Sequence, residues 1–155
     1  MTSPVDGTAV RQVLLTARPL DPAAVLEAVA DASAGGNVVF VGTVRDVTAG
    51  LATVRLEYEA HEPLARAVLA RLCGEAAARF GLVAIAAAHR LGPVEPGEAG
   101  VVVAASSPHR REAFAATEWL MEQIKREVPI WKREHRPTGE REWVHGEEAA
   151  GGRQQ

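Results

Sequence analysis

The sequence predicts an α+β protein in which helices pack on one side of a mixed or antiparallel sheet. Strand-like and helical patterns alternate along the chain as β-α-β-β-α-β-β-α-β, without an internal repeat. The length of 155 residues suits one domain that buries about two-thirds of its unfolded surface. Hydrophobic residues make up 47% and charged residues 24%, the balance of an ordinary globular protein. We therefore expect a single domain over residues 1–145 and a flexible tail over residues 146–155, rich in Gly, Glu and Gln.

The first half of the chain predicts three strands and one helix. Residues 10–16 are β-rich, and an Asp-Pro pair then starts a helix over 21–33, which two glycines end. Residues 37–45 form a second β-rich run that ends in charge. Residues 52–59 alternate apolar and polar side chains, which is typical of a strand with one face in water. The short Gly-containing connection between these two runs favours an antiparallel pair.

The second half of the chain predicts two longer helices and three strands. Residues 63–80 carry an apolar stripe at helical spacing and end before a glycine. Two strands over 82–91 and 101–105 flank a turn rich in Gly and Pro. A long helix over 106–128 begins at Ser-Ser-Pro and ends before Pro129. A short strand at 142–144 precedes the tail.

Composition excludes several classes of function. A net charge of −3 gives no overall attraction to nucleic acid or to an acidic membrane surface. The single cysteine, Cys73, lies in an apolar run and is better explained as a small core residue than as a nucleophile. No Cys/His cluster has zinc-ligand spacing, and no apolar run approaches the ~20 residues that span a bilayer. We expect a cytoplasmic protein without a metal or cofactor.

Two lysines around Pro129 are the most informative feature. Lys125 lies in the last turns of the long helix, and Lys132 follows the proline within Ile-Trp-Lys. Because proline ends the helix, the helix end and the segment that leaves it can direct two ammonium groups to one place. Such a pair suits an anionic ligand or a developing oxyanion. The alternative is a solvated helix end with two surface charges.

A second basic cluster, residues 106–111, lies at the start of the same helix. Free N–H groups, His109 and Arg110 favour an anion there, although a plain N-cap at Ser107 with solvated arginines explains the pattern equally well. Arg110 and Lys125 are 15 positions apart, roughly 22 Å along a helix, too far to touch one small substrate. Either they serve different sites, or two copies of the chain share one composite site.

Two further residues are candidates from their positions alone. Arg45 follows a strand and can reach a cleft, but a lone arginine at a strand end is more often a surface charge. His89 ends an apolar strand, and we favour a structural role for it.

These segments resemble one family, the large, catalytic subunit of molybdopterin synthase, from about residue 13 to residue 144. The resemblance rests on the order and spacing of five segments, at residues 36–46, 56–60, 89–92, 107–110 and 125–134. The last two are the most specific, with the sequences Ser-Pro-His-Arg and Lys-Arg-Glu-Val-Pro-Ile-Trp-Lys-Arg-Glu.

The resemblance implies an α/β-hammerhead fold and a homodimer within a heterotetramer. A small ubiquitin-like sulfur-carrier subunit would insert its C-terminal Gly-Gly thiocarboxylate into each copy. The substrate would be cyclic pyranopterin monophosphate and the product the dithiolene of molybdopterin. Lys125 and Lys132 would be catalytic, and His109 and Arg110 would reach the site from the neighbouring copy. The full substrate-binding set would be Thr43, Val44, Arg45, His109, Arg110, Lys125, Lys132, Arg133 and Glu134.

One departure from the family concerns the C-terminal end, where a further basic residue often follows Trp-Val. Here His145 and Gly146 follow Trp143-Val144, so that contact is either absent or supplied by Arg141 or Arg153. Two alternatives to an enzyme remain: a module that binds a phosphorylated metabolite, which needs the arginines, and a scaffold for a ubiquitin-like partner, which needs neither lysine. Co-purification of a small partner ending in Gly-Gly would support the enzyme.

Overall fold

The computed structural model describes residues 9–144, so the first eight residues of the expected domain, its last residue and the tail over 146–155 lie outside the described residues. The elements of the described part are β1 (Val10–Thr16), α1 (Pro22–Ala28), β2 (Gly36–Thr43), β3 (Val47–Thr48), β4 (Leu51–Ala52), β5 (Arg55–Ala60), α2 (Glu62–Phe80), β6 (Ala84–Arg90), β7 (Gly92–Val94), β8 (Ala99–Ser107), α3 (Arg110–Glu127), β9 (Ile130–His135) and β10 (Arg141–Val144). None of the helices in this range is long and apolar enough to cross a membrane.

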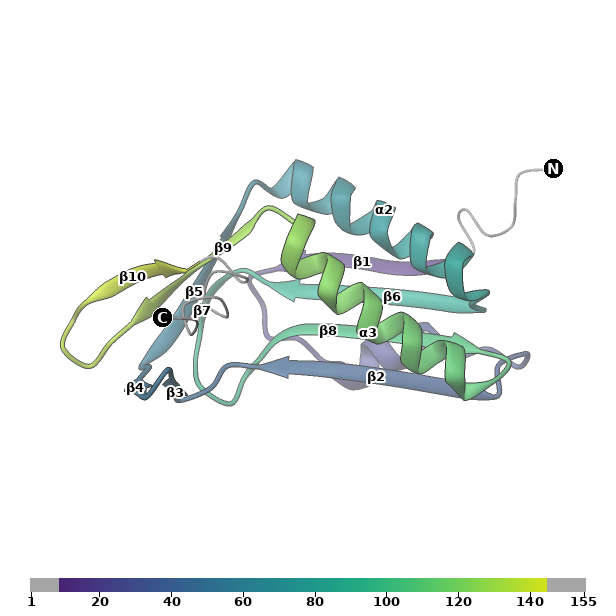
Figure 1. The fold of residues 1–155 in the computed structure, drawn as a ribbon, viewed down its shortest axis with the longest axis horizontal. Helices are drawn as coiled ribbons and strands as arrows, with labels where there is room; N and C mark the ends of the chain where they lie inside the picture. Colours follow the sequence, from purple (N-terminus) through teal and green to yellow (C-terminus); the bar gives the residue numbers. More distant parts are fainter. Residues whose placement is uncertain (1–8, 145–155) are drawn as a thin grey trace.

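The larger sheet has the strand order β1-β6-β8-β2. β1 and β6 are parallel, whereas the β6–β8 and β8–β2 pairs are antiparallel, so the predicted mixed sheet is confirmed. Every residue of β6 is buried, because helices cover both faces of the sheet. In Figure 1 the strands of this sheet follow one another down the view in the order β1, β6, β8 and β2, and α3 lies in front of them.

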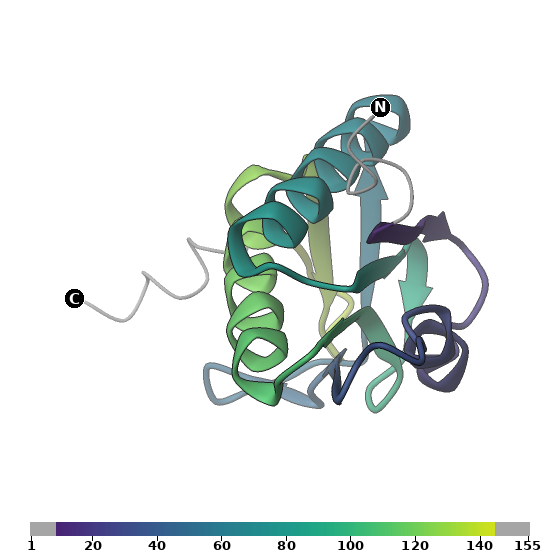
Figure 2. The ribbon, with the colours of Figure 1, turned by 90° about the vertical axis from the view of Figure 1, so that its right-hand side faces the viewer.

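The helices do not all lie on one side of this sheet, contrary to the prediction. Side chains of α2 and α3, including Leu72 and Leu120, form the main core against Ile85, Ala87 and Val103 on one face. On the opposite face, α1 packs against a second cluster that alternates with the first along β6 and β8. Figure 2 shows α1 across the sheet from the two longer helices. The α+β class holds, with a three-layer centre in place of two layers.

The second sheet is antiparallel, with the order β10-β9-β5-β7, and lies beyond one end of the first sheet (Figure 1). The predicted pairing of residues 37–45 with 52–59 is therefore wrong, since β2 pairs with β8 and β5 pairs with β7 and β9. The connection between β2 and β5 forms the small hairpin β3–β4.

Two helix boundaries differ from the predicted ones for local reasons. The first helix ends at Ala28, because Asp31 accepts a hydrogen bond from the Ser33 N–H at 2.9 Å and forms a side-chain turn in place of another helical turn. The last helix begins at Arg110, because β8 continues through Ser107 as part of the sheet. Ser107 therefore does not cap α3. Its hydroxyl donates to the carbonyl of His109 instead.

Candidate functional site

The two predicted lysines line one cavity, which we call the lysine cavity. Its volume is about 110 Å³, and it lies where the end of α3 meets the two sheets. Lys125 reaches it from α3 and is exposed, whereas Lys132 reaches it from β9 and is half-buried. The other lining residues are Tyr58, His89, Val101, Met121, Ile124, Val128 and Ile130. The convergence that Pro129 suggested is therefore present within a single chain.

Lys132 occupies an unusual electrostatic environment. Burial lowers the pKa of its ammonium group, and the positive charges of Lys125 and Arg45 lower this pKa further. The carboxylate of Glu134 acts in the opposite direction and raises the pKa of Lys132. Lys125, Arg45 and Glu134 therefore all lie close enough to Lys132 to affect its pKa, although Arg45 does not line the lysine cavity itself. A lysine with a lowered pKa releases a proton more readily than a solvated one.

The backbone beside Arg45 is fixed by the turn that precedes β8. Val44 is buried, its N–H donates to the Glu98 carbonyl at 3.0 Å, and its carbonyl accepts from the Gly97 N–H at 2.8 Å. A register irregularity between Gly42 and Thr43 changes the direction of the strand end. Thr43 and Arg45 are therefore exposed beside a buried anchor.

Glu134 and Arg133 are adjacent in the predicted site but point to opposite faces of β9, because successive side chains of a strand alternate. Glu134 is only 1% exposed, and its Oε2 lies 2.7 Å from Nη2 of Arg136 in an ion pair that lacks good hydrogen-bond alignment. It raises the pKa of Tyr58, which burial has already raised, to about 12. Glu134 therefore contributes a negative charge beneath the lysine cavity.

Arg133 lies on the outer face of the second sheet. Its guanidinium carbon is 4.2 Å from the centre of the Trp143 ring, and its nitrogens lie 3.8 Å from carboxylate oxygens of Glu57 and Glu59. These contacts connect β9 with β5 and β10. Within one chain the structure does not bring Arg133 to the lysine cavity. Of the two candidates for the extra basic contact, Arg141 lies within the described residues, and it is exposed on β10.

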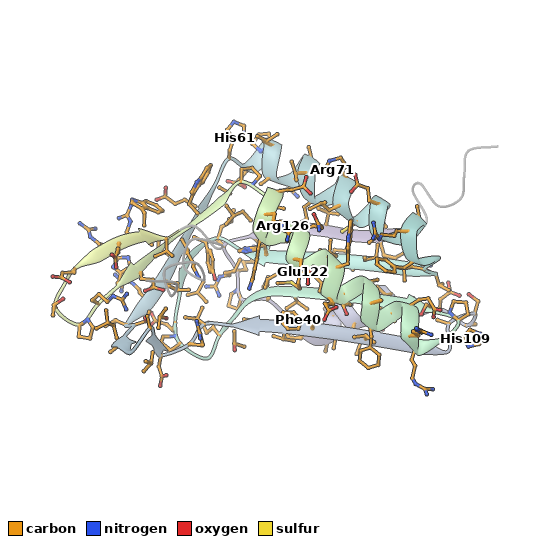
Figure 3. All side chains as sticks on the ribbon, in the orientation of Figure 1. Phe40, His61, Arg71, His109, Glu122 and Arg126 are labelled. Carbon is orange, nitrogen blue, oxygen red and sulfur yellow. The ribbon has the colours of Figure 1, made fainter. Side chains whose placement is uncertain are left out.

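His109 and Arg110 are exposed at the opposite end of α3 from Lys125 (Figure 3). His109 occupies the N-cap position but makes no side-chain capping hydrogen bond, so the first N–H groups of α3 lack that partner. Gly36 allows β2 to approach this helix end, because a Cβ there would lie 2.7 Å from the Arg110 Cα. This pair and the lysines therefore do not meet within one chain.

An apolar groove runs between β2 and α3. Its volume is about 690 Å³, and it is lined by Val38, Val39, Phe40, Arg111, Phe114, Ala115, Thr117, Glu118, Met121, Glu122 and Lys125. Phe40 and Phe114 are 44% and 61% exposed, and β2 is an edge strand, so this surface has no partner within the described chain. Figure 3 shows Phe40 and Glu122 on the two elements that border the groove. Met121 and Lys125 line both hollows, so the groove leads to the lysine cavity.

Two polar residues that line the lysine cavity, Tyr58 and His89, were not among the predicted site residues. Tyr58 stands opposite Lys132 in the β5–β9 register, and the rings of Tyr58 and His89 pack edge to face with centroids 4.9 Å apart. The sequence indicated His89 only by its position at the end of an apolar strand, and a core residue would show the same signal.

Cys73 is fully buried, as predicted, and burial raises the pKa of its thiol to about 12.

Fold and site together define an α+β protein with a cationic cavity at the end of an apolar groove. Within residues 9–144, no three His, Cys, Asp or Glu side chains are grouped to hold a metal ion. The family model described as "MoaE protein" matches residues 15–127. The chain therefore belongs to the MoaE family.

Curated relatives and a solved structure agree with this assignment. A molybdopterin synthase catalytic subunit from Bacillus subtilis is 43% identical over 84% of this chain and 82% of its own length. Catalytic subunit 1 from Mycobacterium tuberculosis is 46% identical over 84% of this chain and 88% of its own length. The crystal structure of molybdopterin synthase from Staphylococcus aureus superimposes with a TM-score of 0.80 at 36% identity, over 84% of this chain and 95% of that one.

Proposed function

We propose that this chain is the catalytic subunit of a molybdopterin synthase. In this role it transfers sulfur from the thiocarboxylated C-terminus of a small carrier subunit to cyclic pyranopterin monophosphate, producing the dithiolene of molybdopterin. The observation that carries the proposal is the convergence of Lys125 and Lys132 on one cavity at the end of an apolar groove. Family membership supports the reaction, since the relatives are named as catalytic subunits of this enzyme. The proposed location is the cytoplasm.

The groove is the proposed approach path for the carrier. Its exposed aromatic residues, Phe40 and Phe114, offer apolar area to a folded partner, and Lys125 and Met121 lie at its junction with the narrow cavity. A Gly-Gly end has no side chains beyond hydrogen, so it suits a cavity of only about 110 Å³. The carrier's negatively charged thiocarboxylate would then lie between two lysines.

The phosphorylated substrate needs cationic groups beyond the lysines. Arg45 supplies one in the same chain, since its charge already acts on Lys132. His109 and Arg110 are too far along α3 to join it, so we propose that they come from a second copy in a homodimer, within a heterotetramer of two catalytic and two carrier subunits. The free N–H groups at the start of α3 would add favourable contacts to the phosphate.

The chemistry follows from the charges in the cavity. The thiocarboxylate sulfur attacks a substrate carbon and displaces an oxygen substituent from it, which joins carrier and substrate as a thioester. Water then adds to the acyl carbon and the acyl carbon–sulfur bond breaks, so the sulfur stays on the substrate and the carrier is released with a terminal carboxylate. Negative charge on the acyl oxygen would be stabilised by Lys125, which is exposed and available to it. Lys132, whose pKa is lowered, is suited to proton transfer. No thiol of this chain is required, since Cys73 is buried elsewhere in the core.

The decisive experiment is reconstitution from purified components. The chain, a thiocarboxylated carrier and the pterin precursor should together yield the dithiolene product, detected by mass spectrometry. The matched control is the same carrier ending in a carboxylate, which has no sulfur to give. If the chain binds the phosphorylated precursor and carrier but no product forms, the alternative of a non-catalytic binding module is favoured.

A further inference from the structure

The lysine cavity contains a neutral imidazole, His89. Its Nδ1 lies 2.8 Å from the carbonyl oxygen of Arg90. A carbonyl oxygen only accepts hydrogen bonds, so Nδ1 carries the ring proton and Nε2 carries a lone pair. Burial lowers the pKa of His89 to about 4, so the ring remains uncharged at neutral pH. The cavity therefore offers an acceptor beside two cationic donors.

The ring of His89 is fixed in place. The residue is 8% exposed and lies in β6, all of whose residues are buried. Tyr58 packs against it with an interplanar angle of 86°. Within residues 9–144 its polar contact is the one from Nδ1, and Nε2 has no hydrogen-bond partner there. Nε2 is therefore an unused acceptor on a fixed ring that lines the cavity.

A peptide end has two polar requirements in such a cavity. Its terminal anion needs donors, which Lys125 and Lys132 supply. Its last peptide N–H needs an acceptor, because a desolvated donor without a partner is costly. The two lysines cannot accept a hydrogen bond while they are charged and bind the anion. The phenol oxygen of Tyr58 lies against Gly100, 3.0 Å from where a Cβ of residue 100 would be. The remaining lining residues have apolar or thioether side chains: Val101, Met121, Ile124, Val128 and Ile130.

We propose that Nε2 of His89 accepts a hydrogen bond from the peptide N–H of the carrier's last glycine. This interaction sets how deeply the carrier's end enters and holds its acyl carbon beside the two lysines. His89 is thus a positioning residue that selects a peptide terminus over other small anions. The inference rests on the proposed function, because it requires a carrier that inserts its C-terminus.

The test removes each partner of the hydrogen bond separately. On the enzyme, His89→Phe keeps an aromatic ring beside Tyr58 but lacks Nε2. On the carrier, semisynthesis replaces the last glycine with glycolate, so that an ester oxygen stands in place of the N–H. Binding of both carboxylate-ended carriers to both enzymes is measured by calorimetry. Each change alone should weaken binding about tenfold, and the two together should weaken it no more than either one.

Each outcome has a definite meaning. Equal binding of amide and ester carriers to the unmodified enzyme overturns the assignment of His89, and this comparison stands even if His89→Phe fails to fold. The assignment is also overturned if the loss of affinity with both changes together equals the product of the two single losses. If the amide carrier does not bind the unmodified enzyme at all, the proposed function itself fails, which is a different result. As a matched control, His61→Asn exchanges the exposed histidine that caps α2 for another capping residue and should leave carrier binding unchanged.

Discussion

Lys125 and Lys132 line the same cavity, although one lies in the last turns of α3 and the other in the middle of β9. Pro129 separates the two elements and Val128, the C-cap of α3, is already extended, with φ −75° and ψ 124°. The chain therefore changes from helix to strand within a few residues. This short connection keeps the backbones of the two lysines close together, so that both side chains reach the same cavity.

The first prediction concerns these lysines. Lys125→Ala and Lys132→Ala should each lower single-turnover sulfur transfer by orders of magnitude, while the chain still folds and binds the carrier. Lys132→Arg should restore little activity, because a guanidinium group does not release a proton at neutral pH. The measurement is rapid-quench transfer from a thiocarboxylated carrier. Near-normal turnover in Lys125→Ala would remove that residue from the chemistry.

The second prediction tests the shared site. An Arg110→Ala chain and a Lys125→Ala chain should each have little activity alone when the precursor concentration is limiting. Random mixing makes half of the dimers mixed, and each mixed dimer keeps one intact site of two, so about a quarter of normal activity should return. Differently tagged chains allow the mixed dimers to be isolated and assayed. Verified mixed dimers without activity would contradict a site built from both copies.

The third prediction separates phosphate binding from chemistry. Arg45→Ala should weaken binding of the pterin precursor by about 1.5–3 kcal/mol, because it removes one charge-assisted contact. Binding of the carrier should change much less. Calorimetry with each ligand separately measures both effects, and Arg55→Ala on the exposed start of β5 is a matched control. Unchanged precursor binding would show that Arg45 is a surface charge that does not bind the phosphate.

The sequence predicted the lysine pair because proline and charge leave local signals. It missed β9 itself, and the reason lies in the same residues. The inner face of β9 carries Lys132 and Glu134, while Trp131 is 44% exposed on the outer face. A strand that places charges inward for function does not alternate in the usual apolar pattern, so periodicity does not reveal it.

Strand pairing was the other failure, and it has a different physical origin. The sequence favoured pairing the neighbouring strands β2 and β5, whereas each joins a different sheet. A local pattern shows which face of a strand is apolar but not which distant strand will cover its edge. The position of His89 in the lysine cavity was not predictable for a similar reason, since the cavity is completed by residues of α3 and β9.

The fourth prediction compares two glycines. A Cβ at Gly100 would lie 3.0 Å from the phenol oxygen of Tyr58 and 3.3 Å from its ring, so Gly100→Ala should force the ring toward the lysine cavity. Such overpacking should lower the free energy of unfolding by about 1–3 kcal/mol and also lower turnover. Gly74 lies inside α2, and a Cβ there would meet no neighbouring atom within 4 Å outside the helix backbone, so Gly74→Ala should raise stability by about 0.5–1 kcal/mol. Denaturant titration of both variants provides the comparison, and equal effects would contradict the close contact at Tyr58.

The last prediction concerns the pH dependence of stability that His89 creates. Its pKa in the folded protein is about 4, below the ordinary value of 6.5, so between these pH values the unfolded chain binds the extra proton. The contribution of His89 to stability is therefore fully present above pH 6.5 and is lost as the pH falls toward 4. The shift corresponds to about 3 kcal/mol.

Between pH 7 and pH 4, the free energy of unfolding of the unmodified protein should therefore fall by about 3 kcal/mol more than that of His89→Phe, which has no imidazole to protonate. Denaturant unfolding across this range measures the difference, and NMR titration of the His89 ring in the unmodified protein checks it independently. A titration midpoint near 6.5, or parallel pH profiles for the two proteins, would show that the ring is not held neutral, and the acceptor role of Nε2 would lose its basis.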